Sequence, residues 1–403
     1  MKHIAAYLMV IVLLLALTPA SAQGVTAESP IILGGTGDDA LHDSLSLPNG
    51  NVIFSIASNG GRNGGEQYAG RTRKAWLICL APDGSTVWEN EFGDAQAGGY
   101  TIFSQLILKN DDSFSGMVSY SIDQHSQYRQ MMTFSTVDGS LIQSGERVMD
   151  SMEADNIFRK FYTSQDYRIA YETHNFNTNL KPRILRLLDN DGNQLWELNA
   201  SENDISHMKQ FIPLSQGTLL YGRDNVGDSI GTNAVAMLVD NSGAMVWDYQ
   251  FSNGSRCGYQ SGIIDSQGRF VVMGTTRGDP ILNEEEKAIG YEDSTSLLLT
   301  CLDVSTGETI FEKIIPMTDR RIPSDQITEF DDRFILCDNG DNYNTIEYQT
   351  IDKDGNLLQH WSDRYPDCGL IGARFFLWNG ELWARSILDG ASMDVYLTRV
   401  VIP

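Results

Sequence analysis

The sequence predicts an all-β protein, a seven-bladed β-propeller of four-stranded blades, and one repeated phrase is the first reason. A short apolar run, a tight turn ending in glycine and a bulky apolar residue about four positions later recur along the chain. The turn glycines, which lie 48 to 64 residues apart by subtraction of their numbers, are Gly84, Gly139, Gly192, Gly243, Gly307 and Gly355. A repeat of this length, made of short alternating strands, is typical of propellers.

Four strand-like stretches fill each interval, and they are the second reason. In the first repeat they begin near His42, Asn51, Lys74 and Thr86. Turns that contain Gly or Asn connect the first stretch to the second and the third to the fourth. β-Branched and aromatic residues alternate with polar ones in these stretches, which indicates strands and hairpins. We expect the four strands of each blade to run from the centre of the molecule to its outside.

An outer strand is missing at the end of the chain, and this is the third reason. Seven third strands can be counted, but the chain stops at Pro403 directly after the seventh. The apolar stretch Ile31–Leu33 precedes the first blade and is free to replace the missing strand. Pairing with Val395–Ile402 would close the ring and cover an open sheet edge.

The beginning of the chain predicts export. Lys2 and His3 are followed by an apolar run to about Leu17 and by small residues at Ala20 and Ala22. This order is that of a secretory signal peptide, and the run is short for a membrane-spanning helix. We therefore expect a signal peptide at 1–22, a linker at 23–30 and one propeller domain at 31–403. The protein should be secreted or otherwise extracytoplasmic, monomeric and without a membrane span once the signal is removed.

Charge and cysteine content exclude several classes of partner. The chain has 29 Lys and Arg against 53 Asp and Glu, a net charge of -24. This balance argues against nucleic acid and anionic membranes, which need clustered basic residues. The five cysteines are widely spaced, without the CxxC pairs of zinc or redox sites. We expect Cys79 and Cys301 to be buried apolar residues.

Loop lengths predict which face carries function. The first-to-second and third-to-fourth connections are tight, whereas the others are long and irregular. In a four-stranded blade each set lies at one end of the sheet, so we call the two ends of the ring the tight-turn face and the long-loop face. Irregular loops on a rigid scaffold are where binding is usually built. The longest connection contains Asn283–Lys287, which is either a helical turn over the channel mouth or a solvated insertion.

Polar residues on the innermost strands, near the channel mouth, are the candidate ligand-binding residues. His, Arg, Tyr and Asp converging on one cavity would suit a polar small molecule, a glycan or a protein segment. The alternative is a channel whose polar lining only binds water. The predicted binding residues are His42, Asp43, Arg159, His207, Tyr259, Asp325 and Arg374, and Gln105, Lys160 and Lys209 lie at similar positions.

Catalytic and metal motifs are not found in the sequence. It has no G-x-S-x-G, H-E-x-x-H or phosphate-binding glycine loop. Asp189–Asn193 and Asp352–Asn356 look like calcium loops, but glycine comes fourth instead of sixth, and turn chemistry explains both. We therefore predict no cofactor or metal and a non-catalytic binding or scaffold propeller. The alternative is a carbohydrate-active hydrolase or lyase using carboxylates such as Asp43 and Asp325.

The phrase Cys301–Gly307, followed by Phe311, resembles the L-D-x-x-T-G-x-x-x-W docking motif of quinoprotein-dehydrogenase-like propellers. Related WD-like repeats occur in many secreted bacterial proteins. The segments Gly34–Asp39 and Pro48–Ile53 look like the opening of an exported propeller family of uncharacterised function. The resemblance covers the mature chain and implies the fold. It implies no quinone chemistry, because quinone-dependent members hold their cofactor over adjacent cysteines, which this chain lacks. A sialidase activity is not implied either, because Ala81–Trp88 departs from the sialidase repeat.

Overall fold

Thirty β-strands form the regular structure in the described part of the chain, as seen in a computed structural model. The described residues are 30–34, 39–59, 73–93, 100–121, 127–150, 157–163, 167–174, 183–189, 194–199, 207–225, 232–253, 256–278, 280–282, 288–291, 295–316, 326–339, 345–364, 369–389, 394–400 and 402. Within these ranges all regular secondary structure is strand, so the predicted all-β class is confirmed.

Most strands belong to four-stranded antiparallel sheets whose order follows the sequence. One contains β10 (Ile157–Thr163), β11 (Tyr167–His174), β12 (Arg183–Asp189) and β13 (Gln194–Asn199), and the next contains β14 (His207–Leu214), β15 (Gly217–Asn225), β16 (Thr232–Asp240) and β17 (Met245–Phe251). A third contains β18 (Cys257–Ile264), β19 (Phe270–Arg277), β22 (Thr295–Leu302) and β23 (Thr309–Pro316), and a fourth contains β24 (Ile327–Phe330), β25 (Arg333–Asn339), β26 (Thr345–Ile351) and β27 (Leu357–Arg364).

The start of the chain forms a larger sheet with two halves. Its strands are β2 (Asp39–Ser46), β3 (Val52–Asn59), β4 (Arg73–Leu80), β5 (Thr86–Phe92), β6 (Tyr100–Asn110), β7 (Ser113–Ser121), β8 (Gln127–Ser135) and β9 (Leu141–Asp150). Strands β2 to β5 and β6 to β9 pair consecutively within each half. The described link between the halves is one parallel pair, Arg73 with Tyr100.

Strands from both ends of the chain share one sheet. Its order is β1 (Ile31–Leu33), β30 (Asp394–Arg399), β29 (Glu381–Asp389) and β28 (Gly369–Trp378). Ile31 lies opposite Leu397 and Leu33 opposite Val395, in antiparallel register. The predicted pairing of Ile31–Leu33 with the C-terminal strand is therefore present.

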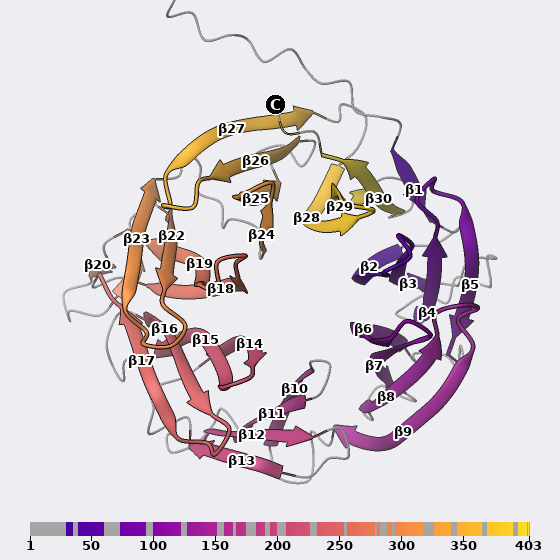
Figure 1. The fold of residues 1–403 in the computed structure, drawn as a ribbon, viewed down its shortest axis with the longest axis horizontal. Helices are drawn as coiled ribbons and strands as arrows, with labels where there is room; N and C mark the ends of the chain where they lie inside the picture. Colours follow the sequence, from indigo (N-terminus) through magenta and orange to yellow (C-terminus); the bar gives the residue numbers. More distant parts are fainter. Residues whose placement is uncertain are drawn as a thin grey trace, which may run out of the picture.

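The sheets stand around a central opening, as Figure 1 shows. Strands β2, β6, β10, β14, β18, β24 and β28 lie innermost, and β5, β9, β13, β17, β23, β27 and β1 lie at the perimeter (Figure 1). This radial arrangement of twisted antiparallel sheets is the architecture of a β-propeller.

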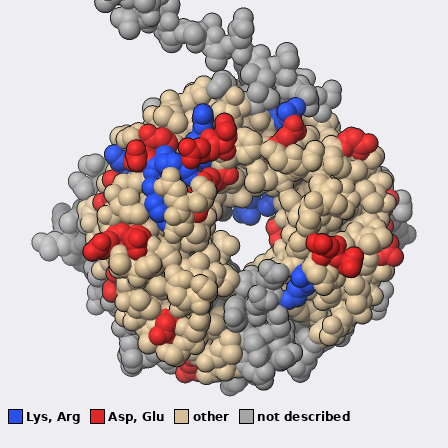
Figure 2. Space-filling view, viewed as in Figure 1, with Lys and Arg blue, Asp and Glu red and all other residues tan. Residues whose placement is uncertain are grey.

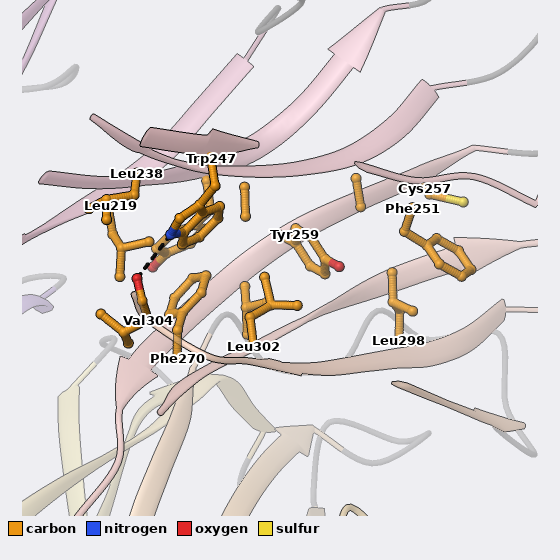
Figure 3. Packing of buried hydrophobic residues seen from close by; sticks show 14 residues of the cluster. Leu219, Leu238, Trp247, Phe251, Cys257, Tyr259, Phe270, Leu298, Leu302 and Val304 are labelled. Atoms are coloured by element: carbon orange, nitrogen blue, oxygen red, sulfur yellow. Dashed lines mark hydrogen bonds between the residues drawn. The ribbon is translucent and has the colours of Figure 1, made fainter. Parts of the chain in front are cut away.

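The hydrophobic core lies between neighbouring sheets. One cluster joins residues of β15 to β17 to residues of β18, β19 and β22, and Figure 3 shows its length. At one end of the cluster Trp247 Nε1 donates a hydrogen bond to the Val304 carbonyl of the next sheet, at 2.9 Å. Trp88 Nε1 makes the same bond to the Thr136 carbonyl, also at 2.9 Å. The tryptophans of the repeated phrase therefore hold adjacent sheets together.

The described glycines of the turns between third and fourth strands fit against the outer strand of the preceding sheet. Gly307 has a φ of +73° and lies so close to Trp247 that a Cβ would be 2.7 Å from Trp247 Cδ2. Glycine is needed there for the left-handed backbone and for the close approach. The same contact recurs between Gly139 and Trp88, Gly243 and Trp196, Gly355 and Phe311, and Gly84 and Ile31.

Aspartates at the tight turns bind backbone amides. Asp240 Oδ1 accepts hydrogen bonds from the Ser242 and Ala244 amides, at 2.8 and 2.9 Å. Asp352 Oδ1 accepts from the Asp354 and Asn356 amides in the same way, at 2.9 and 2.7 Å. This is the turn chemistry expected of Asp. Of the predicted calcium-like loops, Asp352–Asn356 is thus explained as a turn, whereas residues 190–193 of the other lie outside the described part.

An ion-pair network links two sheets through their tight turns. The Asp265 side chain is fully buried and pairs with Arg269, whose Nη2 lies 2.7 Å from Asp265 Oδ2. Lys353, from the β26–β27 turn, lies 4.0 Å from the same oxygen and also pairs with Glu329 of β24. Glu329 in turn accepts the Ser266 amide, at 2.7 Å.

Two further expectations can be compared with the structure. Cys79 and Cys301 are buried as expected, and burial raises the pKa of each thiol to about 11. Residues 283–287, for which a helical turn and a solvated insertion are the two alternatives, lie outside the described part. The strands on either side of them, β20 (Pro280–Leu282) and β21 (Ala288–Tyr291), pair as a small antiparallel sheet. The described part of the chain contains no apolar helix of membrane-spanning length.

Candidate binding site at the inner strands

Several innermost strands carry an extra residue in their pairing with the second strand. The register shifts between Leu41 and Asp43 in β2, between Met208 and Gln210 in β14, and between Tyr259 and Ser261 in β18. Strands β6 and β28 have comparable shifts. Such bulges bend the strand and redirect side chains, and they are common next to functional sites.

Asp43 lies next to the bulge of β2 and contacts the adjacent inner strand. Its Oδ2 accepts the Leu106 amide of β6 at 2.7 Å, and its Oδ1 accepts the Ser44 amide at 2.8 Å. Gln105, within the β6 bulge, has a φ of +56°, an uncommon left-handed backbone for a non-glycine residue. We attribute the direction of the Leu106 amide, away from the β6–β7 ladder and toward Asp43, to this irregularity.

Two arginines act on the same carboxylate. Burial raises the pKa of Asp43, while the positive charge of Arg385 and, to a smaller extent, that of Arg374 counteract the rise, as do the two amides. Arg374 in β28 and Arg385 in β29 lie opposite each other in the pairing of those strands. Arg385 is buried and Arg374 is exposed. Asp43, the Leu106 amide, Arg374 and Arg385 therefore form a polar group at the meeting point of β2, β6 and β28, which we call the Asp43 cluster.

The central opening is visible in the space-filling view. Figure 2 shows Lys or Arg atoms at the margin of this opening. The innermost strands that border the opening include β2, β6 and β28 (Figure 1). A ligand entering the opening would thus meet the strands that carry the Asp43 cluster.

Hydrogen bonds of a structural kind also join neighbouring inner strands. Ser261 Oγ of β18 accepts the Ile327 amide of β24, at 3.1 Å. Gln326 Oε1 accepts the Phe375 amide of β28, at 3.2 Å. The bond from Leu106 to Asp43 belongs to this series, so it fastens adjacent sheets. The charges of two arginines distinguish the Asp43 cluster from the other bonds of this series.

Tyr259 does not belong to the candidate site. Its side chain is 1% exposed and lies in the inter-sheet core, in the middle of the cluster that Figure 3 shows. Its hydroxyl donates to Thr300 Oγ1, at 2.8 Å, and burial raises its pKa well above the ordinary value. The prediction that Tyr259 faces the channel mouth was wrong, because the ring lies on the same side of β18 as the buried Cys257.

The remaining predicted residues are placed to different degrees. His42 is half-buried at the β2 bulge, beside Asp43, and Lys209 is exposed at the β14 bulge. In the backbone register, Arg159 of β10 lies opposite Glu172 of β11, and His207 of β14 lies opposite Arg223 of β15. The side chains of Arg159, Lys160 and His207 lie outside the described part, as does the whole of Asp325.

Arg385 is the site residue that sequence reasoning missed. It lies on a second strand, whereas only first strands were considered as channel lining. The sequence Glu381–Asp389 does not indicate that Arg385 would be buried and act on Asp43, because Arg385 and Asp43 come from opposite ends of the chain. This electrostatic interaction depends on β28 and β29 lying beside β2, and residues of both strands lie close to residues of β2.

The sheet order and the radial arrangement define the class of protein as an all-β repeat protein with propeller architecture. No protein-family model and no curated protein matches the chain.

Several solved structures are similar at low identity. The β-propeller domain of the trilobed protease from Pyrococcus furiosus, described as having an open velcro topology, is 7% identical over 90% of this chain and 93% of its own, with a TM-score of 0.49. Hydrazine synthase from Kuenenia stuttgartiensis is 10% identical, with coverages of 95% and 100% and a TM-score of 0.48. The WD40 domain of SCAP from fission yeast is 8% identical, with coverages of 92% and 97% and a TM-score of 0.43. The assignment to propeller architecture rests on the sheet order and Figure 1.

Proposed function

We propose that this protein is an extracytoplasmic, non-catalytic binding or scaffold propeller with seven blades. The count of seven treats β2 to β5 and β6 to β9 as separate blades, which is reasonable because one parallel pair links them. The pairing of β1 with β30 supports a ring closed by strands from both ends of the chain. The leader-like sequence at 1–22 supports export, and the docking phrase around Asp303–Phe311 supports the quinoprotein-like type of repeat.

The observation that carries the binding function is the convergence at Asp43. The Asp43 carboxylate is oriented by two amides, from β2 and β6, and lies in the field of two arginines from β28 and β29. The exposed guanidinium of Arg374 can then bind a carboxylate, phosphate or sugar hydroxyl in a preorganised setting. The carboxylate of Asp43 is already engaged by these groups, which favours recognition over proton transfer. The ligand would be a polar small molecule, a glycan or a protein segment.

The test is an array of glycans, small polar molecules and peptides on the protein without residues 1–22, followed by one substitution. Arg374→Ala should weaken binding of a hit by about 10- to 100-fold, since a hydrogen bond to a charged group contributes about 1.5–3 kcal/mol. The matched control is Arg399→Ala, which removes an arginine 2.6 Å from Glu381 elsewhere on the sheet. Unchanged binding in Arg374→Ala would contradict the site. Hydrogen-exchange protection confined to the turns Asp83–Gly84 and Asp354–Gly355 would place the ligand on the wrong face.

A carbohydrate-active hydrolase or lyase is the second candidate, and the raised pKa of Asp43 favours it. A general acid needs a carboxyl whose pKa is raised toward neutral pH, and burial shifts the pKa of Asp43 in that direction. Turnover of a glycan that is abolished by Asp43→Asn, with unchanged melting, would establish the enzyme and reject the binding-only function. Turnover that persists in Asp43→Asn would exclude Asp43 as the acid.

A further inference from the structure

A pair of arginines lies at the long-loop ends of two neighbouring sheets, separate from the Asp43 cluster. Arg223 is near the end of β15, and Arg256 directly precedes β18. Strand β15 starts at a tight turn, so its last residues reach the long-loop face. Figure 3 shows the same direction in the adjoining core, where Trp247 and Val304 lie at the tight-turn end and Cys257 lies at the other end.

The backbone around Arg256 is fixed by both sheets. Residue 256 forms a parallel bridge with Thr232, at the start of β16, and its carbonyl accepts the Arg277 amide at 3.1 Å. Thr232 Oγ1 donates to the carbonyl of Cys257, the next residue, at 2.6 Å. These bonds hold the two sheets together at the long-loop end. The position from which the Arg256 side chain starts is therefore well defined.

Gly258 has no side chain and so leaves room for the aliphatic part of Arg223. A Cβ at Gly258 would lie 3.2 Å from Arg223 Cβ and 3.6 Å from its Cδ. Contacts below about 3.4 Å require a neighbour to move, so any larger residue would displace Arg223. The stem of Arg223 thus rests against β18, on the side of the strand to which Arg256 also belongs by the alternation of residues 256 and 258.

The two guanidinium groups repel each other. Burial lowers the pKa of Arg223, and the positive charge of Arg256 lowers it further. Arginine nevertheless stays protonated in proteins, so the repulsion is not relieved by loss of a proton. An oxyanion between the two groups would relieve it and accept hydrogen bonds from both planar forks. Such a basic pair stands out in a chain with a net charge of -24.

We infer that Arg223 and Arg256 form a binding site for an anionic group, a carboxylate or a phosphate, carried by the ligand of the long-loop face. The inference rests on the proposed function, because it places the ligand on the face assigned there. It adds the chemical class of the ligand, namely an acidic sugar or another small molecule with an oxyanion.

The test compares glucuronate, glucose 6-phosphate and glucose, each titrated by calorimetry at low ionic strength. Both charged sugars should bind, or one of them, and glucose should bind at least about tenfold more weakly. Arg223→Gln and Arg256→Gln should each weaken the charged sugar by about tenfold or more, the usual effect of losing a charged hydrogen-bond donor. Arg186→Gln, which removes an arginine 2.9 Å from Glu197, is the matched control and should bind as the unchanged protein does.

Each result either supports or overturns the inference. Equal binding of all three sugars, or no binding of any, overturns it, as does binding that survives both substitutions. Loss of binding in Arg374→Ala with full binding in Arg223→Gln overturns it while leaving the proposed function standing. If a glutamine variant fails to fold, two measurements on the unchanged protein decide. Inorganic phosphate should raise the melting temperature, and rising chloride concentration should reduce that effect. A melting temperature that phosphate does not raise would reject the site.

Discussion

Replacing Trp247 by Ala should destabilise the protein strongly through the contact between two sheets. The side chain is 8% exposed, and its ring packs on the Gly307 turn of the next sheet. Truncation of a buried Trp to Ala costs about 3–5 kcal/mol. Part of this comes from the Val304 carbonyl, which loses its donor, and an unsatisfied buried acceptor costs about 1–3 kcal/mol. Trp247→Phe should isolate that part, because it keeps most of the ring packing.

Gly307→Ala provides the matching partner for a double-mutant cycle. As a single substitution it should lower the free energy of unfolding through two effects. The left-handed backbone contributes about 1–2 kcal/mol, and the clash of the new Cβ with the Trp247 ring adds a further cost. In the Trp247→Ala background the second cost disappears, so the two changes should be non-additive by about 0.5–3 kcal/mol. Urea unfolding followed by far-UV circular dichroism measures all four proteins without relying on tryptophan fluorescence. The exposed neighbour Val246, replaced by Ala, should cost less than about 0.5 kcal/mol. Additive effects of Trp247→Ala and Gly307→Ala would refute the contact.

Three further changes test other parts of the structure. Truncation after Met393 removes β30 and unpairs β1, so the product should aggregate or unfold without cooperativity; a melting curve like that of the full chain would contradict the joining of the two ends. Hydrogen bonds from the Ser242 hydroxyl and the Ala244 amide lower the pKa of Asp240, so its contribution to stability is present above the unfolded-state pKa of about 3.9 and is lost as pH falls. Asp240→Ala should therefore flatten the acid limb of the stability profile in pH titrations of unfolding. The pKa of Asp43 is raised by burial, so the sign is opposite and its contribution to stability declines as pH rises from the unfolded-state pKa through the higher folded-state value. Asp43→Asn should remove that decline, and a decline that persists would exclude Asp43 as its source.

The architecture could be read from the sequence because its cause is local and repeated. The turns between third and fourth strands use a glycine with a left-handed backbone, as at Gly84 and Gly243, and such a glycine is a local signal for the hairpin. The missing outer strand at Pro403 and the spare apolar stretch at Ile31 followed from counting. The alternation of apolar and polar residues along a strand depends only on neighbouring residues, and it describes most strands well.

The candidate site could be read only in part, because its geometry depends on distant residues. Tyr259 shares its side of the strand with Cys257, and that alternation could have indicated burial, but its partner Thr300 lies 41 residues away. Asp43 was selected correctly as an inner-strand residue, yet the orientation of its carboxylate depends on the left-handed Gln105 of another strand. No propensity predicts a positive φ at a glutamine. The charge of Arg385 acts on Asp43 only because the two ends of the chain meet.

The contacts between sheets have a consequence for the order of folding. Trp88 and Thr136 are 48 residues apart and Trp247 and Val304 are 57 apart, so each sheet can dock on its predecessor soon after it is synthesised. The hydrogen bond from Trp378 Nε1 to the Gly50 carbonyl spans 328 residues, and it joins β28, in the sheet that contains β1 and β30, to the β2–β3 turn. Bringing such distant segments together carries the largest loop entropy, and contacts of this kind slow folding. We expect an intermediate in which consecutive sheets are docked but β1 has not yet paired with β30. The first and last sheets then still have unpaired edges. This intermediate should be the species most exposed to aggregation before synthesis is complete.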